Sequence, residues 1–182
     1  LDPKVAQVAK QFFHVKETPK HKIHFSDGRQ FLRLNKTRKY DAILMDAYTS
    51  NQFGTHIPFH LATKEFFRLA AEDLTEEGVL VFNVIGTYDD WRSDIVGSMY
   101  QTLKSVFPNV YHFQASDTRN IVMLAVKSKE PLTSTTLKNK VAALRAARPK
   151  LPKSFGPRVA RIRAQAPKSA ANAGVLTDDF AP

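Results

Sequence analysis

The sequence predicts an α/β domain built around a mostly parallel sheet whose last two strands pair antiparallel. Short apolar runs alternate with segments that are apolar at helical spacing, a pattern typical of parallel sheets covered by helices on both faces. The runs at residues 110–113 and 121–126 are separated by a short polar turn. Because a parallel connection needs a much longer crossover, these two strands are expected to be antiparallel.

The amino-terminal part is expected to contain two helices around a short strand. Asp2 followed by Pro3 is a typical helix start, because Asp caps the first turn and Pro fits the first helical position. Residues 23–25 are expected to form a strand that ends at Asp27 and Gly28, before a second, short helix. The apolar positions that repeat at helical spacing in the first helix are Val5, Val8, Ala9, Phe12 and Phe13.

The central part should supply two strands and two helices. Residues 42–45 are predicted to form a strand buried on both faces, followed by a loop over residues 47–58. Thr63 can cap a helix that extends to Leu74. Residues 79–85 form the next apolar strand, and the following helix should run from Asp90 to Phe107, where Pro108 stops it.

Composition excludes several classes of protein. The hydrophobic share of 43% and the charged share of 24% are those of an ordinary globular domain. The sequence has no Cys, which excludes disulfides and thiolate chemistry and fits a reducing compartment. No apolar run approaches the roughly 20 residues of a membrane-spanning helix, so we expect a cytoplasmic protein. The chain begins with Leu1 rather than Met, which indicates a fragment or a processed chain.

Positive charge is concentrated in one segment. The net charge is +10, and residues 127–174 contain twelve Lys or Arg against the single acid Glu130. We therefore divide the chain into an α/β portion at residues 1–126, a basic helix with a linker or arm at residues 127–174, and a closing motif at residues 175–182. The basic segment could bind nucleic acid or anionic lipid. Alternatively it is a solvated, partly disordered insertion, and its single aromatic residue, Phe155, makes nucleic acid the less favoured partner.

Asp46 is the main candidate for chemistry. It follows directly on the apolar strand at residues 42–45, and the carboxyl ends of strands in open α/β sheets are where ligands bind. A carboxylate at the end of a buried strand is costly unless a cation or hydrogen-bond donor meets it. The alternative is an Asp that caps the following turn.

Six short runs, in this order and spacing, resemble the spermidine synthase family of polyamine aminopropyltransferases, and more closely its bacterial spermidine-synthase-like branch. The runs are LDPKV, SDGRQFL, YDAILMDAY, IPFHLATKEFF, GVLVFNV and LTDDFAP. The resemblance implies the Rossmann-like class I S-adenosylmethionine-dependent methyltransferase fold, here without its first strand and the family's amino-terminal part. It also implies transfer of an aminopropyl group from decarboxylated S-adenosylmethionine to an amine such as putrescine, without a metal, by a homo-oligomer.

The resemblance also implies roles for individual residues. Asp27 would bind the adenine amino group, Gly28 would let the backbone approach the ring, and Asp2 would lie next to the ribose. Asp46 matches the acid that handles the substrate amine, and Tyr48 could add an aromatic wall or a hydroxyl group. These roles are chemically consistent, because carboxylates stabilise a sulfonium cation and one within hydrogen-bond reach can accept the amine proton.

Three departures leave other functions open. The family's glycine-rich first strand and its acidic ribose ligand would precede Leu1. Thr49 stands where polyamine-making members carry a second Asp, and residues 116–119 replace the family's Tyr-Pro loop. One alternative is therefore a methyltransferase that uses intact S-adenosylmethionine on the same fold. The other is a catalytically inactive fragment whose basic arm binds nucleic acid or another anion.

Two pairs of polar residues and one single asparagine are weaker candidates. His56 and His60 have a metal-ligand spacing only on a helix, and Pro58 between them argues against a helix there, so no metal site is expected. Asn83 could reach the same crevice as Asp46 or only satisfy backbone groups. Asp178 and Asp179 could either edge the site or serve a structural role.

Overall fold

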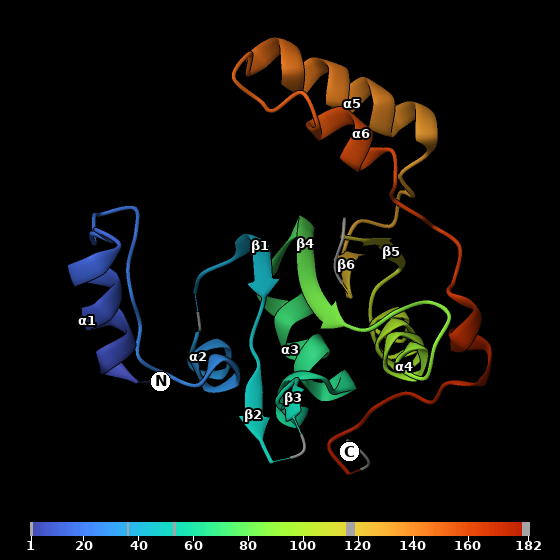
Figure 1. The fold of residues 1–182 in the computed structure, drawn as a ribbon. Helices are drawn as coiled ribbons and strands as arrows, with labels where there is room; N and C mark the ends of the chain where they lie inside the picture. The colour runs from blue at the N-terminus through green and yellow to red at the C-terminus, as the bar shows by residue number, and fades with distance from the viewer. Residues whose placement is uncertain (1, 36, 53, 116–118, 180–182) are drawn as a thin grey trace. The chain divides into compact units, whose positions relative to one another are not determined.

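The computed structural model describes residues 2–35, 37–52, 54–115 and 119–179 (Figure 1). Contacts between residues divide the chain into two compact units, Leu1–Thr37 and Arg38–Pro182. The boundaries expected from composition, at residues 126/127 and 174/175, stay predictions. Residues 116–118, which stand in place of the family's Tyr-Pro loop, lie outside the described part of the chain. So do residues 180–182, the end of the closing motif.

The first unit contains two capped helices. Helix α1 (Pro3–Phe12) begins after Asp2, whose carboxylate accepts a hydrogen bond from the Lys4 amide at 2.8 Å. Helix α2 (Gly28–Leu34) begins after Asp27, which accepts from the Gln30 amide at 3.0 Å. Both helix starts were predicted, because an N-cap is a contact within three residues of sequence.

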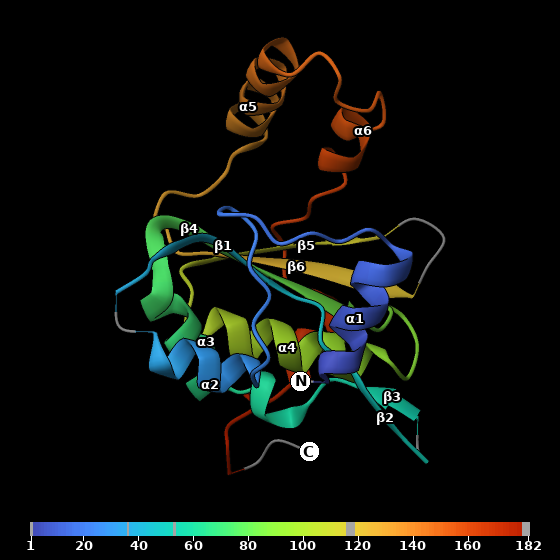
Figure 2. The same cartoon turned by 90° about the vertical axis from the view of Figure 1, so that its left-hand side faces the viewer.

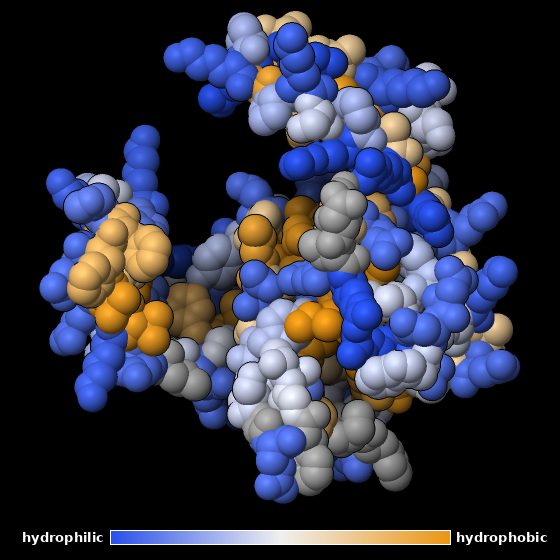
Figure 3. Space-filling view, in the orientation of Figure 1, coloured by the Kyte–Doolittle hydropathy of each residue, from blue (hydrophilic) through white to orange (hydrophobic). Residues whose placement is uncertain are grey.

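The strand predicted at residues 23–25 is wrong. These residues carry no ladder, and the only bridge that the structure describes in this unit joins Thr18 and His21. A three-residue run forms a strand only where a neighbouring strand offers hydrogen bonds, and the described residues of this unit provide none. The predicted apolar stripe of α1 is also mostly exposed, with Phe13 at 74% and Val5 at 68%, and it forms an apolar patch in Figure 3.

The second unit is built on a mixed four-stranded sheet in the order β1-β4-β6-β5. Strand β1 (Tyr40–Met45) pairs with β4 (Leu74–Ile85) in parallel. Strand β6 (Asn120–Val126) pairs antiparallel with both β4 and β5 (Asn109–Gln114). The predicted antiparallel pairing of the last two strands is confirmed. Within this four-stranded sheet, β1 and β4 are the pair that is parallel.

One face of this sheet forms the core. Helix α3 (Lys64–Asp73) and helix α4 (Ser93–Lys104) lie on the same side of the sheet in Figure 2. Alternate residues of β4 and β6 point toward them and are almost fully buried. The fully buried side chains of this core include Phe66, Phe67, Leu80, Phe82, Met99, Leu103, Ile121 and Met123.

The opposite face of the sheet is less buried than predicted. Leu44 of β1 is 73% exposed, and Val81 and Leu124 are half-buried. The prediction of a strand buried on both faces is therefore wrong for β1, because β1 is an edge strand of the described sheet and α3 and α4 cover only the other face. An apolar run cannot by itself distinguish a strand buried on two faces from one buried on a single face.

Three element boundaries differ from those predicted. Strand β4 begins at Leu74, where a helix was expected, because Leu74 pairs with Tyr40 at the start of β1. Helix α4 begins at Ser93, because Asp90 instead accepts hydrogen bonds from the Thr87 hydroxyl and the Arg92 amide in a preceding turn. The loop expected at residues 47–58 contains the hairpin β2 (Thr49–Asn51) and β3 (Gly54–His56), followed by the 3₁₀ helix η1 (Phe59–Leu61).

The carboxyl-terminal part includes helix α5 (Ser134–Ala147), helix α6 (Phe155–Val159) and the 3₁₀ helix η2 (Lys168–Asn172). After α6 the chain returns to the sheet, where Arg163 and His112 exchange backbone hydrogen bonds at 2.8 and 3.0 Å. Beyond η2, the Leu176 carbonyl accepts from the Lys64 amide at 2.9 Å, and Asp178 accepts from the Thr63 hydroxyl at 2.7 Å. The closing motif therefore holds the start of α3. Among the helices that the structure describes, none has both the length and the apolar character needed to cross a bilayer.

The close packing of η2 on α4 gives the first prediction. A Cβ atom at Gly97 would lie 2.5 Å from the Ser169 carbonyl oxygen, which is backbone and cannot move aside alone. We expect G97A to lower the free energy of unfolding by about 1–3 kcal/mol, although Ala is the better helix former. Urea denaturation measures the change. G174A is the control, because a Cβ there meets nothing within 4 Å; equal stability of G97A and wild type would contradict the described packing.

The buried imidazole that anchors the returning chain gives a pH prediction. His112 Nε2 donates to the Gln165 carbonyl at 2.7 Å, and in the neutral ring Nδ1 accepts from the Tyr88 hydroxyl, which lies 2.7 Å away. Burial lowers the pKa of His112 below its ordinary value, and the Arg163 charge lowers it further, against the hydrogen bond to Gln165. The unfolded chain therefore binds the proton more readily, and stability falls as the pH drops below about 6.5.

Urea denaturation of wild type and H112Q between about pH 7.5 and pH 5.5 tests this reasoning. The stability advantage of wild type over H112Q should shrink as the pH is lowered. Parallel pH dependence of the two proteins would show that His112 is not held neutral.

Candidate functional site

Asp46 follows directly on β1, at the carboxyl end of the parallel pair β1 and β4. Its Oδ1 accepts a hydrogen bond from the Asn83 side-chain amide at 2.9 Å. The Asn83 Oδ1 in turn accepts from the Asn120 side-chain amide at 2.9 Å. Asp46 is exposed rather than buried, so its carboxylate is open to a ligand while amides from two neighbouring strands hold its orientation.

Tyr48 contacts the same asparagine. Its hydroxyl group donates to the Asn83 carbonyl oxygen. Burial of the half-buried ring raises the pKa of Tyr48 to about 12, and the nearby Asp46 charge acts in the same direction. Tyr48 is therefore a neutral hydrogen-bond donor at physiological pH. The structure thus brings Asp46 and Tyr48 together through Asn83.

A cavity of about 610 Å³ opens beside Tyr48. The end of β4 at Ile85, the β3 strand of the hairpin, the start of α4 and Leu176 of the returning chain surround it. Its lining is mainly apolar and includes Ile57 and Phe59, and it carries charged groups at Arg92 and Asp94. The Arg92 guanidinium lies 4.6 Å from the centre of the Trp91 ring. Such a cavity suits an elongated ligand with an apolar middle and a charged end.

Asp2, Asp27 and Gly28 belong to the unit Leu1–Thr37. Both carboxylates cap helices. A Cβ atom at Gly28 would meet nothing within 4 Å, so the space beside its backbone is open to a ligand. Their roles in binding a nucleotide stay predictions.

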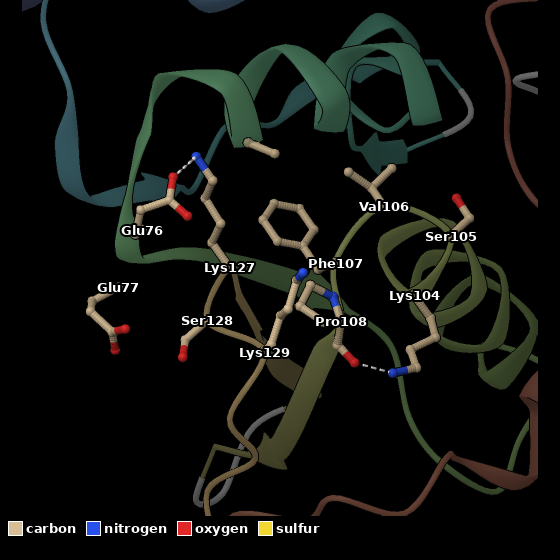
Figure 4. A pocket seen from close by; sticks show the side chains of 11 residues that line it. Glu76, Glu77, Lys104, Ser105, Val106, Phe107, Pro108, Lys127, Ser128 and Lys129 are labelled. Carbon is tan, nitrogen blue, oxygen red and sulfur yellow. Dashed lines mark hydrogen bonds and ion pairs between the residues drawn. The ribbon is translucent and has the colours of Figure 1, made fainter.

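A second cavity, of about 690 Å³, lies at the opposite end of β4, as Figure 4 shows. Several charged side chains line it, but two of its lysines already have partners. Lys127 contacts Glu76 at 3.2 Å and the Leu74 carbonyl at 3.0 Å, and Lys104 donates to the Pro108 carbonyl. Since parallel strands bind ligands at their carboxyl ends, we place the candidate site at Asp46 and not here.

No group of three or more potential metal ligands is found among the residues that the structure describes. His56 lies in β3 and stacks on the Phe59 ring at 5.4 Å, whereas His60 lies in η1. The two imidazoles therefore come from different elements, with Pro58 between them.

Two features of the site were missed or left undecided by sequence reasoning. Asn120 was missed, because it stands at the amino end of β6. In an antiparallel pair the amino end of one strand meets the carboxyl end of its neighbour, so Asn120 lies near Asn83. The only sequence signal was a polar residue that begins an apolar strand. Asn83, for which two roles were open, performs both: its side chain reaches Asp46, and its carbonyl receives Tyr48.

Comparisons with known proteins find relatives among polyamine aminopropyltransferases and spermine synthases. The polyamine aminopropyltransferase of Vibrio vulnificus is 32% identical over 134 residues, which are 72% of this chain and 42% of that protein. The spermine synthase of Arabidopsis thaliana is 31% identical over 112 residues, which are 58% of this chain and 30% of that protein. The chain therefore spans less than half the length of these curated relatives.

Solved structures show the same fold. A probable spermidine synthase from Corynebacterium glutamicum matches with a TM-score of 0.70 and 20% identity, over 98% of this chain and 61% of that one. Human methyltransferase-like protein 13, solved in complex with SAH, also has a TM-score of 0.70, with 22% identity over 85% of this chain and 72% of that one. The second unit thus carries the Rossmann-like fold of S-adenosylmethionine-dependent methyltransferases.

The family itself is identified by a sequence model of the spermine/spermidine synthase domain, which matches residues 1–137. This match includes the whole first unit and the second unit as far as residue 137, with all five predicted site residues and the whole four-stranded sheet. It ends inside α5, so the rest of the basic segment lies beyond it. Because the model covers well over half of the sequence, the chain belongs to the spermine/spermidine synthase domain family.

Proposed function

We propose that this chain forms part of an aminopropyltransferase that transfers the aminopropyl group of decarboxylated S-adenosylmethionine to an amine such as putrescine. The observation that carries the proposal is the Asp46 carboxylate, exposed at the carboxyl end of β1 and oriented by Asn83 at 2.9 Å. Family membership and the two named relatives support the same reaction.

The reaction needs a base at this position. The amine nitrogen attacks the methylene carbon bonded to the sulfonium, a new C–N bond forms, and the C–S bond breaks to release a neutral thioether. The attacking amine must lose a proton, which a carboxylate within hydrogen-bond reach can accept. In our proposal Asn83 holds Oδ1 of Asp46, and Oδ2 accepts that proton.

The cavity beside Tyr48 would bind the rest of the amine. The methylene groups of a diamine would pack against Ile57, Phe59 and the Tyr48 ring. Its distal ammonium group would lie near the Asp94 carboxylate, since an aromatic ring and a carboxylate both favour a cation. Tyr48 acts here through its ring and its neutral hydroxyl group, not as a base.

The donor would be bound by residues of the first unit. Asp27 would accept the adenine amino group, Gly28 would leave room for the ring, and Asp2 would lie next to the ribose. The open space at the Gly28 backbone supports this assignment. By analogy with the family, we also propose a homo-oligomer.

A second function is favoured by one specific observation. The second Asp of polyamine-making members is replaced by Thr49, which pairs with His56 in the β2–β3 ladder. The hairpin therefore presents no carboxylate at that position. A methyltransferase that uses intact S-adenosylmethionine would not need this acid, and it would use the same fold.

Isothermal titration calorimetry with the two donors distinguishes these functions. Aminopropyl transfer predicts tighter binding of decarboxylated S-adenosylmethionine, because the intact donor adds a carboxylate that must be accommodated near Asp46. We expect a preference of at least about tenfold, equal to about 1.4 kcal/mol. Tighter binding of intact S-adenosylmethionine would favour the methyltransferase, and binding of neither would contradict both.

The role of Asp46 can be tested on the reaction. We expect D46N to lower kcat/KM for aminopropyl transfer by about 10²–10⁴-fold, because the amide keeps the shape but cannot accept the proton. D41N is the matched control, since Asp41 lies on the same strand and accepts a hydrogen bond from the Thr75 hydroxyl at 3.2 Å, away from the site. Near-normal activity of D46N would exclude Asp46 as the base.

A further inference from the structure

Helices α5 and α6 form a separate hairpin that the transferase site does not use. Figures 1 and 2 both show the two helices standing clear of the sheet. No residue of either helix is fully buried. The family model ends at residue 137, so most of this surface, residues 134–163, lies outside the part of the chain that family membership explains. We call these residues the basic hairpin.

The basic hairpin is strongly and uniformly positive. It contains nine Lys or Arg residues and no Asp or Glu, so it holds most of the chain's net charge of +10. No acid within the segment can therefore balance these charges. Its surface is mostly hydrophilic in Figure 3, interrupted by apolar patches. The basic residues are Lys138, Lys140, Arg145, Arg148, Lys150, Lys153, Arg158, Arg161 and Arg163.

An apolar groove runs between the two helices. It encloses about 390 Å³ and is lined by Leu137 and Val141 of α5 and by Val159 and Ile162 on the α6 side. These four side chains are only half-buried. Lys138 and Arg145 also line the groove. A long and a short helix cannot bury an apolar stripe between them, whereas a third helix laid into the groove would do so.

The hairpin is held firmly where it leaves and rejoins the sheet. On the entry side, the Leu132 amide donates to the Tyr111 hydroxyl at 2.7 Å, and Asn109 donates to the Ser128 carbonyl at 2.9 Å. On the exit side, Arg163 pairs with His112 of β5. The groove is therefore presented by an anchored element and not by a loose tail.

We propose that the groove of the basic hairpin binds an acidic amphipathic helix of a partner protein. Apolar side chains spaced three and four residues apart would enter between α5 and α6, and Asp or Glu beside them would meet Lys138 and Arg145. Charge complementarity requires an anionic partner, and the apolar lining requires that it also carry apolar side chains. A nucleic acid backbone would satisfy the first requirement but would leave the apolar groove empty. Nucleic acid is also disfavoured because Phe155 is the single aromatic residue in the hairpin that could stack on a base.

The test uses two designed peptides of about 18 residues, long enough for several helical turns. One has a Leu stripe at helical spacing flanked by Glu, and the other has the same composition in scrambled order. Fluorescence anisotropy measures their binding to the full chain. We expect the amphipathic peptide to bind at least about tenfold more tightly than the scrambled one, because only it can bury a continuous apolar face.

Matched variants locate the binding surface. We expect R145Q to weaken peptide binding by about fivefold and V141Q by about tenfold. R148Q is the control for Arg145, because it removes the same charge at the C-cap residue of α5, which does not line the groove, and it should change affinity by less than about twofold. Urea denaturation checks that V141Q keeps the stability of wild type. If it does not, the comparison of peptide affinity between R145Q and R148Q decides whether the groove is the binding surface.

Two results would overturn the proposal. The first is equal binding of the two peptides, or equal effects of R145Q and R148Q, which would show that only net charge matters. The second is tighter binding of a duplex DNA of about 20 base pairs, with an affinity that falls steeply with salt and is unchanged in V141Q. Donor binding to the transferase site is measured separately, so failure here leaves the proposed reaction untouched.

Discussion

Strand β4 carries hydrogen-bond ladders on both of its edges, to β1 in parallel and to β6 antiparallel, and this double pairing positions the candidate site. One set of its alternating side chains, including Leu80 and Phe82, packs against α3 and α4. The other set includes Asn83, which therefore reaches across both neighbouring strands to Asp46 and Asn120. A shift of one residue in β4 would exchange these two sets, so core packing and the orientation of Asp46 depend on the same register.

The returning carboxyl-terminal chain couples the site to the rest of the second unit. Arg163 joins the edge of β5, η2 packs on α4 where Gly97 leaves room, and Leu176 lines the cavity beside Tyr48. In the sequence, the basic hairpin lies between β6 and Arg163, which pairs with β5, and the hairpin does not contribute to the core. One chain thus combines a family domain, whose exposed Asp46 carboxylate we propose as the base, with an anchored basic surface that we propose as a docking site.

Features that depend on a few adjacent residues could be predicted. The caps at Asp2 and Thr63 are contacts within three residues, and the motif runs identified the family without any knowledge of packing. Features that depend on distant segments were predicted poorly. The exposure of Leu44 depends on which elements cover β1, the start of β4 depends on the pairing of Leu74 with Tyr40, and the role of Asn120 depends on the antiparallel direction of β6.

The sequence by itself therefore determined the family, the alternation of helices and strands, and Asp46 as the acid that follows the first strand of the sheet. Only the tertiary structure decided that Asn83 orients this acid, that Tyr48 is buried enough to stay neutral, and that part of the basic segment packs against β5 and α4. The physical reason is the separation in sequence between the residues that interact. Capping and side-chain periodicity act within one or two turns of chain, whereas these later contacts join residues that are 35 or more positions apart.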